Sequence, residues 1–387
     1  MFAALGRPQL AARVPPTTAA AAPRIFAQSA CSTPSSSSSS SSRVEKLPSS
    51  SIPVLRTVDA VRRWRRPHTL AQQTVGLVPT MGALHAGHLA LVRAAARECH
   101  HVVVSVFLNP AQFGEREDLA SYPSTWAADA AALARLDREE LAADGANLGR
   151  LSAVFAPPPT EMYPSGPPGQ AVDSKGSFVT ITPVGEVLEG ASRPTFFRGV
   201  ATVCMKLFNI VQPDRVYFGQ KDVQQTVVVR RMVSDFAVPT KVVVCPTERA
   251  EDGLALSSRN VYLGTRRRRV AVVLNRALVA AANSYGGGNL RREAVLGTAR
   301  EVVAAVVQAQ ARLAPTQRVL FEVDYISLAD PDTLQEVDVI DPERGAVLSG
   351  AIKMLPLEEA VPGEDVGHAG GPAVRLIDNL ILEPIKA

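Results

Sequence analysis

The chain has 387 residues, of which 46% are hydrophobic and 20% are charged, which is enough for one large folded domain or two of ordinary size. Its formal net charge is +4, and no apolar run reaches the roughly 18 to 20 residues that a membrane-spanning helix requires. These totals predict a soluble globular protein and exclude one that crosses a membrane.

The positive charge is concentrated at the N-terminus. Residues 1–44 contain four arginines and no acidic residue, so the rest of the chain is formally neutral. A neutral body argues against nucleic acid as a partner, because binding to a phosphate backbone needs clustered cations. The Ala- and Ser-rich tail has the composition of an organellar transit peptide, and a plain disordered extension explains it equally well. We therefore expect residues 1–50 to be a disordered extension, and the location to be cytoplasmic or mitochondrial.

The cysteines suggest neither disulfides nor a zinc site. The four of them lack a CxxC pair and a matched histidine spacing, and they are Cys31, Cys99, Cys204 and Cys245. A reducing compartment fits this usage best.

From residue 75 the chain repeats a pattern of strand, turn and helix. Apolar, strand-like runs occupy residues 75–80, 101–109, 153–157, 178–182, 215–219 and 241–247, and runs with helical spacing occupy 89–98, 199–212 and 222–236. This alternation predicts an α/β fold with a Rossmann-like parallel sheet and helices on both faces. In such sheets the ligands bind at the carboxyl ends of the strands.

The pattern changes after Tyr262. Two Arg- and Ala-rich helical segments are followed by three strand-like runs; they occupy residues 266–284, 290–313, 323–329, 346–355 and 374–382. We therefore expect a catalytic domain over residues 51–263 and a smaller α+β domain over residues 264–387. The turn-rich residues 362–372 are expected to form a surface loop.

The stretch VPTMGALHAGH (residues 78–88) places His85 and His88 where a strand gives way to a helix. Gly82 and Gly87 let the backbone approach a ligand closely, and the N-terminus of the following helix favours an anion. Zinc is the weaker interpretation, because metalloprotease motifs place two histidines at i and i+4 within one helix. A purely structural pair of imidazoles is the remaining alternative for an isolated HxGH motif.

Three more polar clusters follow predicted strands, over residues 104–125, 217–225 and 246–263, so all four can meet in one cleft. With VPTMGALHAGH, the motifs NPAQF, FRGVATVCMKLFNIVQPDRVYFGQKDVQQ and DGLALSSRNVYL resemble those of the pantothenate synthetases (pantoate–β-alanine ligases) of the HxGH nucleotidyltransferase superfamily. The resemblance extends over nearly all of residues 52–385.

This resemblance implies a ligase that joins pantoate to β-alanine in two steps. Pantoate and ATP give an enzyme-bound pantoyl adenylate and diphosphate, and the amine of β-alanine then releases pantothenate and AMP. The family also implies Mg²⁺, held mostly by phosphates and water, and a homodimer.

The resemblance also implies roles for individual residues. The catalytic residues would be His85, His88 and Lys221, with His88 as a proton donor whose pKa lies near 6.5. ATP would be bound by Met81, Gly82, His85, Gly87, His88, Gly219, Lys221, Asp222, Glu248, Leu256, Ser257, Ser258 and Arg259, and pantoate by Asn109, Gln112 and Gln225. No direct metal ligand is assigned, and Asp129 is only a candidate for an acid near the metal.

The chain departs from the family pattern at several places. Glu248 replaces an aliphatic residue beside the adenine, and Gln220 replaces the Glu of a GEKD motif. Residues 136–152 and 358–373 are extra segments expected at the surface, with a subunit contact or a regulatory site as alternatives.

Three alternative functions remain. One is another HxGH adenylyltransferase, which would transfer AMP to a nucleotide or to phosphopantetheine. The others are a nucleotide-binding regulatory module without turnover and an RNA-binding relative of the synthetases. The NPAQF motif and the two glutamines of DVQQ argue against the first.

Overall fold

A computed structural model of the chain describes residues 45–114, 117–169 and 171–385. Most of the predicted extension, with any transit peptide, therefore lies outside the described residues. Leu47 is buried with Ile52 in the core, so the fold includes residues 45–50. Val44–Ala387 form one compact unit, and the proposed division between residues 263 and 264 stays a prediction.

The larger sheet is entirely parallel, with the strand order β1-β4-β3-β2-β5-β6. Its strands are β1 (Val54–Leu55), β2 (Val75–Thr80), β3 (His101–Val106), β4 (Arg150–Phe155), β5 (Arg215–Gly219) and β6 (Lys241–Cys245). The chain runs outward from β2 through β3 to β4 and then returns to β5 on the other side of β2. The carboxyl ends of β2 and β5 therefore border a topological switch point, where open α/β sheets bind ligands.

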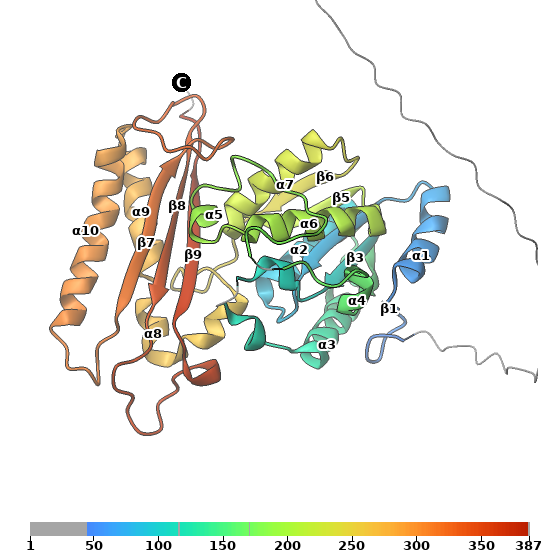
Figure 1. Ribbon diagram of the computed structural model, residues 1–387, viewed down its shortest axis with the longest axis horizontal. Helices are drawn as coiled ribbons and strands as arrows, with labels where there is room; N and C mark the ends of the chain where they lie inside the picture. The colour runs from blue at the N-terminus through green and yellow to red at the C-terminus, as the bar shows by residue number, and fades with distance from the viewer. Residues whose placement is uncertain (1–44, 115–116, 170, 386–387) are drawn as a thin grey trace, which may run out of the picture. The chain divides into compact units, whose positions relative to one another are not determined.

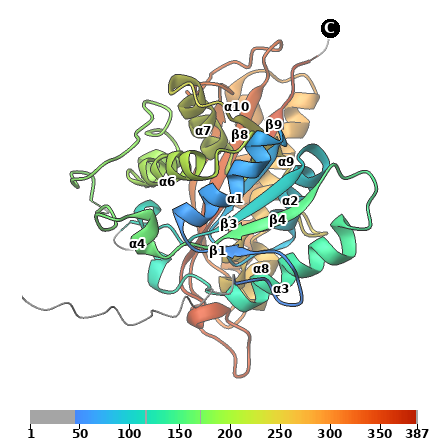
Figure 2. The ribbon, with the colours of Figure 1, turned by 90° about the vertical axis from the view of Figure 1, so that its right-hand side faces the viewer.

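Helices cover both faces of this sheet (Figure 2). One face packs against α1 (Val58–Leu70), α6 (Phe196–Val211) and α7 (Val223–Asp235), and the other against α2 (Ala86–Glu98) and α3 (Trp126–Leu136). Double coverage explains why β2 and β3 are nearly continuous in apolar and β-branched residues. The prediction of a Rossmann-like parallel sheet is confirmed.

The C-terminal part contains an antiparallel sheet in the order β7-β8-β9 (Figure 1). Its elements are α8 (Gly264–Val270), α9 (Val273–Gly286), α10 (Arg292–Ala311), β7 (Phe321–Ala329), β8 (Ala346–Met354) and β9 (Val374–Leu382). Helices α9 and α10 pack on this sheet around a separate apolar core. The smaller α+β part is therefore also confirmed.

Several predicted elements need correction. Residues 178–182 are not a strand, because the Val179 N–H donates to the Thr202 hydroxyl at 3.0 Å instead of to a neighbouring strand. The helix expected over residues 266–284 is two helices, α8 and α9. Five elements were not predicted from the sequence, namely α1, α3, β1 and two single-turn helices, α4 (Pro159–Met162) and α5 (Glu189–Ser192). Helix α1 carries four arginines and a proline, so its apolar residues are too few to give a clear helical pattern.

The two extra segments, which were expected at the surface, are partly buried. Residues 142–147 are mostly exposed, but Asp137 and Leu141 are buried in a π-helical turn that continues α3. Near the second segment, the fully buried Arg267 donates to the carbonyls of Val366 and Pro372, which holds this loop against the core.

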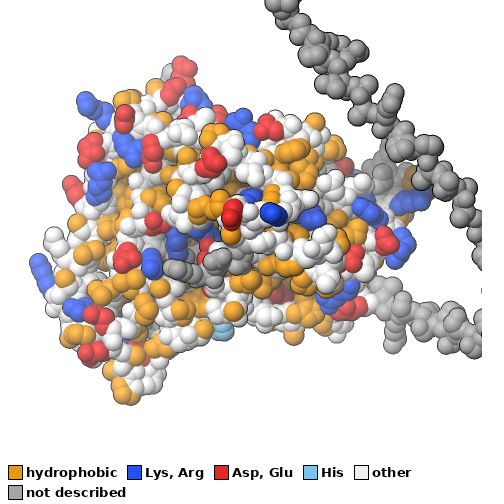
Figure 3. All heavy atoms as spheres, in the orientation of Figure 1, with side chains coloured by type: hydrophobic (Ala, Val, Ile, Leu, Met, Phe, Trp, Pro, Cys, Tyr) orange, Lys and Arg blue, Asp and Glu red, His pale blue; other side chains and the backbone are white. Residues whose placement is uncertain are grey.

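Basic and acidic side chains are interspersed over the face drawn in Figure 3. Some of the charged side chains at the surface form ion pairs, such as Arg300 with Glu293 (2.6 Å) and Arg344 with Asp332 (2.8 Å). Within the described residues, no helix is both long and apolar enough to cross a membrane.

Candidate active site

A cavity of about 180 Å³ lies at the carboxyl ends of β2, β3 and β5. It brings together most of the residues that the sequence motifs indicated, namely Met81, His85, His88, Asn109, Gln112, Lys221, Asp222, Gln225, Ser257, Ser258 and Arg259. A second cavity of about 900 Å³ extends toward the antiparallel sheet and shares Lys221, Asp222, Gln225, Ser257 and Arg259 with the first. The four polar clusters therefore meet as expected.

The two histidines are fixed by the first turn of α2. Helix α2 begins at Ala86, three residues earlier than predicted, and His85 is its N-cap. The Gly87 N–H donates to Nδ1 of His85 at 3.1 Å, and the His85 N–H donates to Nδ1 of His88 at 3.4 Å. The rings lie against each other with their centroids 4.1 Å apart and their planes tilted by 41°. A Cβ at position 87 would lie 2.9 Å from the His85 ring, so a side chain there would displace this ring.

Both imidazoles are neutral near pH 7. Burial, followed by the charge of Lys221, lowers the pKa of His85 to about 4. Burial, His85 and Lys221 lower the pKa of His88 to about 3. The pKa of His88 is therefore well below the expected 6.5, because the sequence does not reveal the desolvation of this ring. Since each Nδ1 accepts a hydrogen bond, each neutral ring carries its proton on Nε2 and keeps that N–H as a donor.

The loop between β2 and α2 is anchored by Asp129. This buried carboxylate on α3 accepts hydrogen bonds from the N–H groups of Ala83 (2.9 Å) and Leu84 (2.8 Å) and from the Thr125 hydroxyl (3.1 Å). Gly82 has a φ of +85°, which favours glycine. Asp129 therefore shapes this loop with bonds that occupy both of its oxygens.

Lys221 follows β5 in the short 3-10 helix η4 (Gln220–Asp222). Its Nζ lies 3.0 Å from Oδ2 of Asp222. The amide of Asn379, on β9, donates to the carbonyls of Gln220 and Lys221, both at 2.8 Å. The Gln220 amide donates in turn to Oδ1 of Asn379 at 3.3 Å, so the C-terminal sheet fixes the backbone that carries the lysine.

The Ser257–Ser258–Arg259 segment reaches the cavity from the loop after β6. Ser258 donates to the carbonyl of Ala83 at 2.8 Å, which ties this loop to the histidine loop. Arg259 makes a two-point ion pair with Asp118, with distances of 3.0 and 2.9 Å. The two side chains are 27% and 24% exposed, so the pair places a guanidinium at the cavity but satisfies part of its hydrogen-bonding capacity.

Asn109 and Gln112 form a fixed amide pair. The Asn109 Nδ2 donates to Oε1 of Gln112 (3.0 Å) and to the Gly199 carbonyl (3.2 Å), while its Oδ1 accepts from the Tyr163 hydroxyl (2.6 Å). Asn109 therefore has little capacity left for a ligand and instead supports its neighbour. Because the Gln112 oxygen is occupied, Gln112 offers its Nε2 group, which has no partner among the described residues.

The two adjacent glutamines of α7 have different surroundings. Gln224 is buried, and its amide donates to the carbonyls of Val184 (2.9 Å) and Val187 (2.7 Å). Gln225 lines both cavities and has no hydrogen bond within the described part of the chain. Of these two, Gln225 is therefore the one available to a ligand, in agreement with the sequence-based expectation.

Five predicted ATP-binding residues do not line the smaller cavity. They are Gly82, Gly87, Gly219, Glu248 and Leu256. A Cβ added to Gly219 would meet no atom within 4 Å, so open space adjoins it. The Glu248 carbonyl accepts from the Leu256 N–H at 2.9 Å, and the Glu248 side chain lies close to Gly87. ATP binding by these five residues stays a prediction.

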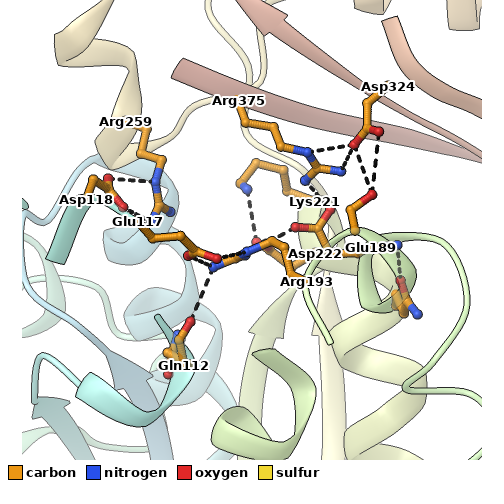
Figure 4. A network of polar contacts seen from close by, with 12 residues as sticks. Gln112, Glu117, Asp118, Glu189, Arg193, Lys221, Asp222, Arg259, Asp324 and Arg375 are labelled. Atoms are coloured by element: carbon orange, nitrogen blue, oxygen red, sulfur yellow. Dashed lines mark hydrogen bonds and ion pairs between the residues drawn. The ribbon is translucent and has the colours of Figure 1, made fainter. Parts of the chain in front are cut away.

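An ion-pair network beside the cavity was not anticipated (Figure 4). Arg193 pairs with Glu117 and with Glu189 (3.1 Å), and it donates to the Gln112 carbonyl at 3.2 Å. Glu189 also pairs with Arg375 of β9. Arg193 lies in the ASRP stretch before α6 and belongs to no recognisable motif. Its contacts with Glu117, Glu189 and Gln112 could therefore be found only from the structure.

Comparisons with known proteins agree with this architecture. A family model described as pantoate-beta-alanine ligase matches residues 53–381. The pantothenate synthetase of Chloroflexus aggregans is 45% identical over 329 residues, which cover 85% of this chain and 99% of that relative.

Two solved structures are similar along most of their length. The pantothenate synthetase from Thermus thermophilus is 40% identical with a TM-score of 0.66, covering 86% of this chain and 99% of that one. The pantoate-beta-alanine ligase from Francisella tularensis, complexed with beta-gamma ATP and beta-alanine, is 28% identical with a TM-score of 0.60, covering 86% and 98%.

Proposed function

The chain belongs to the pantoate-beta-alanine ligase family, and on this premise we propose that it condenses (R)-pantoate with β-alanine in an ATP-dependent reaction. The products are pantothenate (vitamin B5, in the coenzyme A pathway), AMP and diphosphate, and the intermediate is a bound pantoyl adenylate. The observation that carries the proposal is the meeting of a histidine pair, a lysine and the amides of Gln112 and Gln225 around one cavity.

In the first step a carboxylate oxygen of pantoate attacks the α-phosphorus of ATP, and the bond to diphosphate breaks. Negative charge increases on the phosphate oxygens, so the reaction needs positioned donors more than covalent help. The Nε2–H groups of His85 and His88 and the ammonium of Lys221 are suited to this task. A bound polyphosphate would also raise the pKa of His88, because an opposite charge favours the imidazolium, and this makes His88 the candidate proton donor.

In the second step the amine of β-alanine attacks the acyl carbon of the adenylate. The bond to the AMP oxygen breaks, and the amine loses a proton to solvent or to a nearby base. Gln112 and Gln225 are proposed to hold the pantoyl hydroxyls. Gln112 would donate through its Nε2 group, and the amide of Gln225 can both donate and accept. Asn109 is proposed to act through Gln112.

The nucleotide is proposed to lie across Met81, the glycines at positions 82, 87 and 219, and the 256–259 segment, with Asp222 toward the ribose and the Glu248 backbone toward the adenine. The relative from Francisella tularensis, crystallised with beta-gamma ATP, supports a nucleotide site in this fold. The described residues hold no group of three or more His, Cys, Asp or Glu side chains suited to a metal ion. Mg²⁺ therefore fits as part of the nucleotide substrate, bound by phosphate oxygens and water.

The decisive experiment is an assay with ATP, pantoate and β-alanine in which each component is omitted in turn. We expect pantothenate only with all three, and diphosphate release with ATP and pantoate alone in single-turnover amounts. AMP transfer to a nucleotide or to phosphopantetheine, without any need for β-alanine, would instead identify an adenylyltransferase.

We also propose a homodimer, which light scattering of the purified protein can test. Residues 1–44 are proposed to decide between cytoplasmic and mitochondrial location. A fluorescent fusion with and without these residues should change compartment if they are a transit peptide and should not if they are a plain extension.

A further inference from the structure

Ser105 is a buried hydroxyl without a hydrogen-bond partner at the smaller cavity. It lies on β3, its exposed fraction is 0%, and its Oγ has no partner among the described residues. It nevertheless lines the same cavity as His88, Gln112 and Gln225. A buried hydroxyl left unpaired destabilises a fold, so its place beside a ligand cavity suggests a function.

The surroundings of Ser105 define what it could bind. Helix α6 forms an apolar wall of the same cavity. This wall consists of Val200, Val203, Cys204 and Leu207, all at least 93% buried. The groups suited to phosphate, Lys221 and the two histidines, line the same cavity from the loops after β2 and β5. These surroundings suit a ligand with an aliphatic body, an anionic group directed to Lys221 and the histidines, and a hydroxyl within reach of Ser105.

We propose that Ser105 binds the terminal hydroxyl of pantoate, the one remote from its carboxylate, and so contributes to substrate specificity. This inference rests on the proposed function. With the carboxylate directed to the α-phosphate, the branched carbon lies against the apolar wall and the terminal hydroxyl reaches β3. The Ser105 hydroxyl then gains the partner that the described residues do not provide.

The test uses Ser105→Ala and a matched control. Ser327→Ala removes another buried hydroxyl without a partner among the described residues, on β7, which lines neither cavity. Both substitutions should leave the midpoint of thermal unfolding unchanged or raise it, because each removes an unsatisfied group. Only Ser105→Ala should raise the KM for pantoate, by roughly 5- to 50-fold, with the KM for ATP unchanged. Ser105→Cys, which keeps the branching of the side chain but replaces the hydroxyl with a weakly donating and somewhat larger thiol, should also raise the KM for pantoate.

Two analogues of pantoate, each lacking one hydroxyl, make the test specific. The analogue without the terminal hydroxyl should react equally well with the native enzyme and with Ser105→Ala, whereas the other analogue should still discriminate between them. An unchanged KM for pantoate in Ser105→Ala, or equal discrimination with all three acids, overturns the proposal and assigns the hydroxyl to an ordered water or to packing. If the native enzyme forms no pantothenate, the proposed function fails instead.

Discussion

The molecule contains two pairs of imidazoles in close contact, one at each end of the parallel sheet. His85 and His88 lie at the carboxyl end with ring centroids 4.1 Å apart, and His68 and His101 lie at the amino end with centroids 3.7 Å apart. His101 also has a pKa lowered to about 4, chiefly by burial and then by His68, His100 and Arg65. Close ring contact and a lowered pKa therefore do not distinguish the two pairs.

The difference lies in the hydrogen-bonding capacity that each pair retains. The two nitrogens of His101 bond to Ser152 and Gln73, both at 2.9 Å, and Gln73 also accepts from His68 at 3.2 Å. The Nδ1 atoms of His85 and His88 accept from the backbone N–H groups of Gly87 and His85, and both rings keep Nε2 for the cavity. A polar cluster is a candidate site when its hydrogen-bond donors remain available beside a cavity. In the cluster around His101 both ring nitrogens have side-chain partners, so we assign it a structural role.

The sharpest way to test this comparison is to remove one ring from each pair. His88→Ala should slow adenylate formation about 10²- to 10⁴-fold, the usual contribution of a positioned acid or base, as measured by diphosphate release. His101→Ala should leave the rate within about twofold, because this ring does not line either cavity. Unchanged turnover in His88→Ala would remove that ring from the mechanism.

The same contrast applies to two glutamines. Gln112→Ala should raise the KM for pantoate roughly 10-fold, because the substrate loses a donor in a buried site, and should barely change the KM for ATP. Gln73→Ala, which removes an amide committed to the amino-end histidines, is the control and should change neither constant. Equal increases in both constants for Gln112→Ala would argue against a contact with pantoate.

For stability we expect the amino-end pair to be the important one. His101→Ala should lower the free energy of unfolding by about 1 to 2 kcal/mol, because Ser152 and Gln73 lose a partner. Chemical denaturation with urea would measure this loss. An unchanged unfolding midpoint in His101→Ala would show that the amino-end cluster does not stabilise the fold. The proposal that this pair has a structural role would then be wrong.

The smallest effect concerns pH. The folded protein holds His85, His88 and His101 at pKa values of about 4, 3 and 4, whereas an unfolded chain has values near 6.5. Between pH 6.5 and 4 the unfolded chain therefore binds more protons, so stability is complete above pH 6.5 and falls as the pH is lowered. In His101→Gln the urea midpoint should fall less steeply over this window. Parallel curves would contradict the low pKa of His101.

The larger features could be predicted from the sequence because they depend on local patterns. The alternation of apolar strands and helices located the parallel sheet, and the polar residues after β2, β3, β5 and β6 were expected to meet because parallel strands end at one edge. The strand predicted over residues 178–182 was wrong, since an apolar, β-branched run does not reveal whether a neighbouring strand exists to pair with it. The low histidine pKa values, the role of Asp129 and the Arg193 network depend on partners that are distant in sequence.

The bond between Asn379 and the lysine loop has a consequence for biosynthesis. Every residue proposed to touch a substrate precedes position 260, yet the Lys221 carbonyl is held by an amide 158 residues further along the chain. A ribosome will therefore have produced all of the chemistry-bearing side chains well before the strand that fixes the lysine emerges. Competence to activate pantoate should therefore appear only after strand β9 has been translated and has folded against the lysine loop.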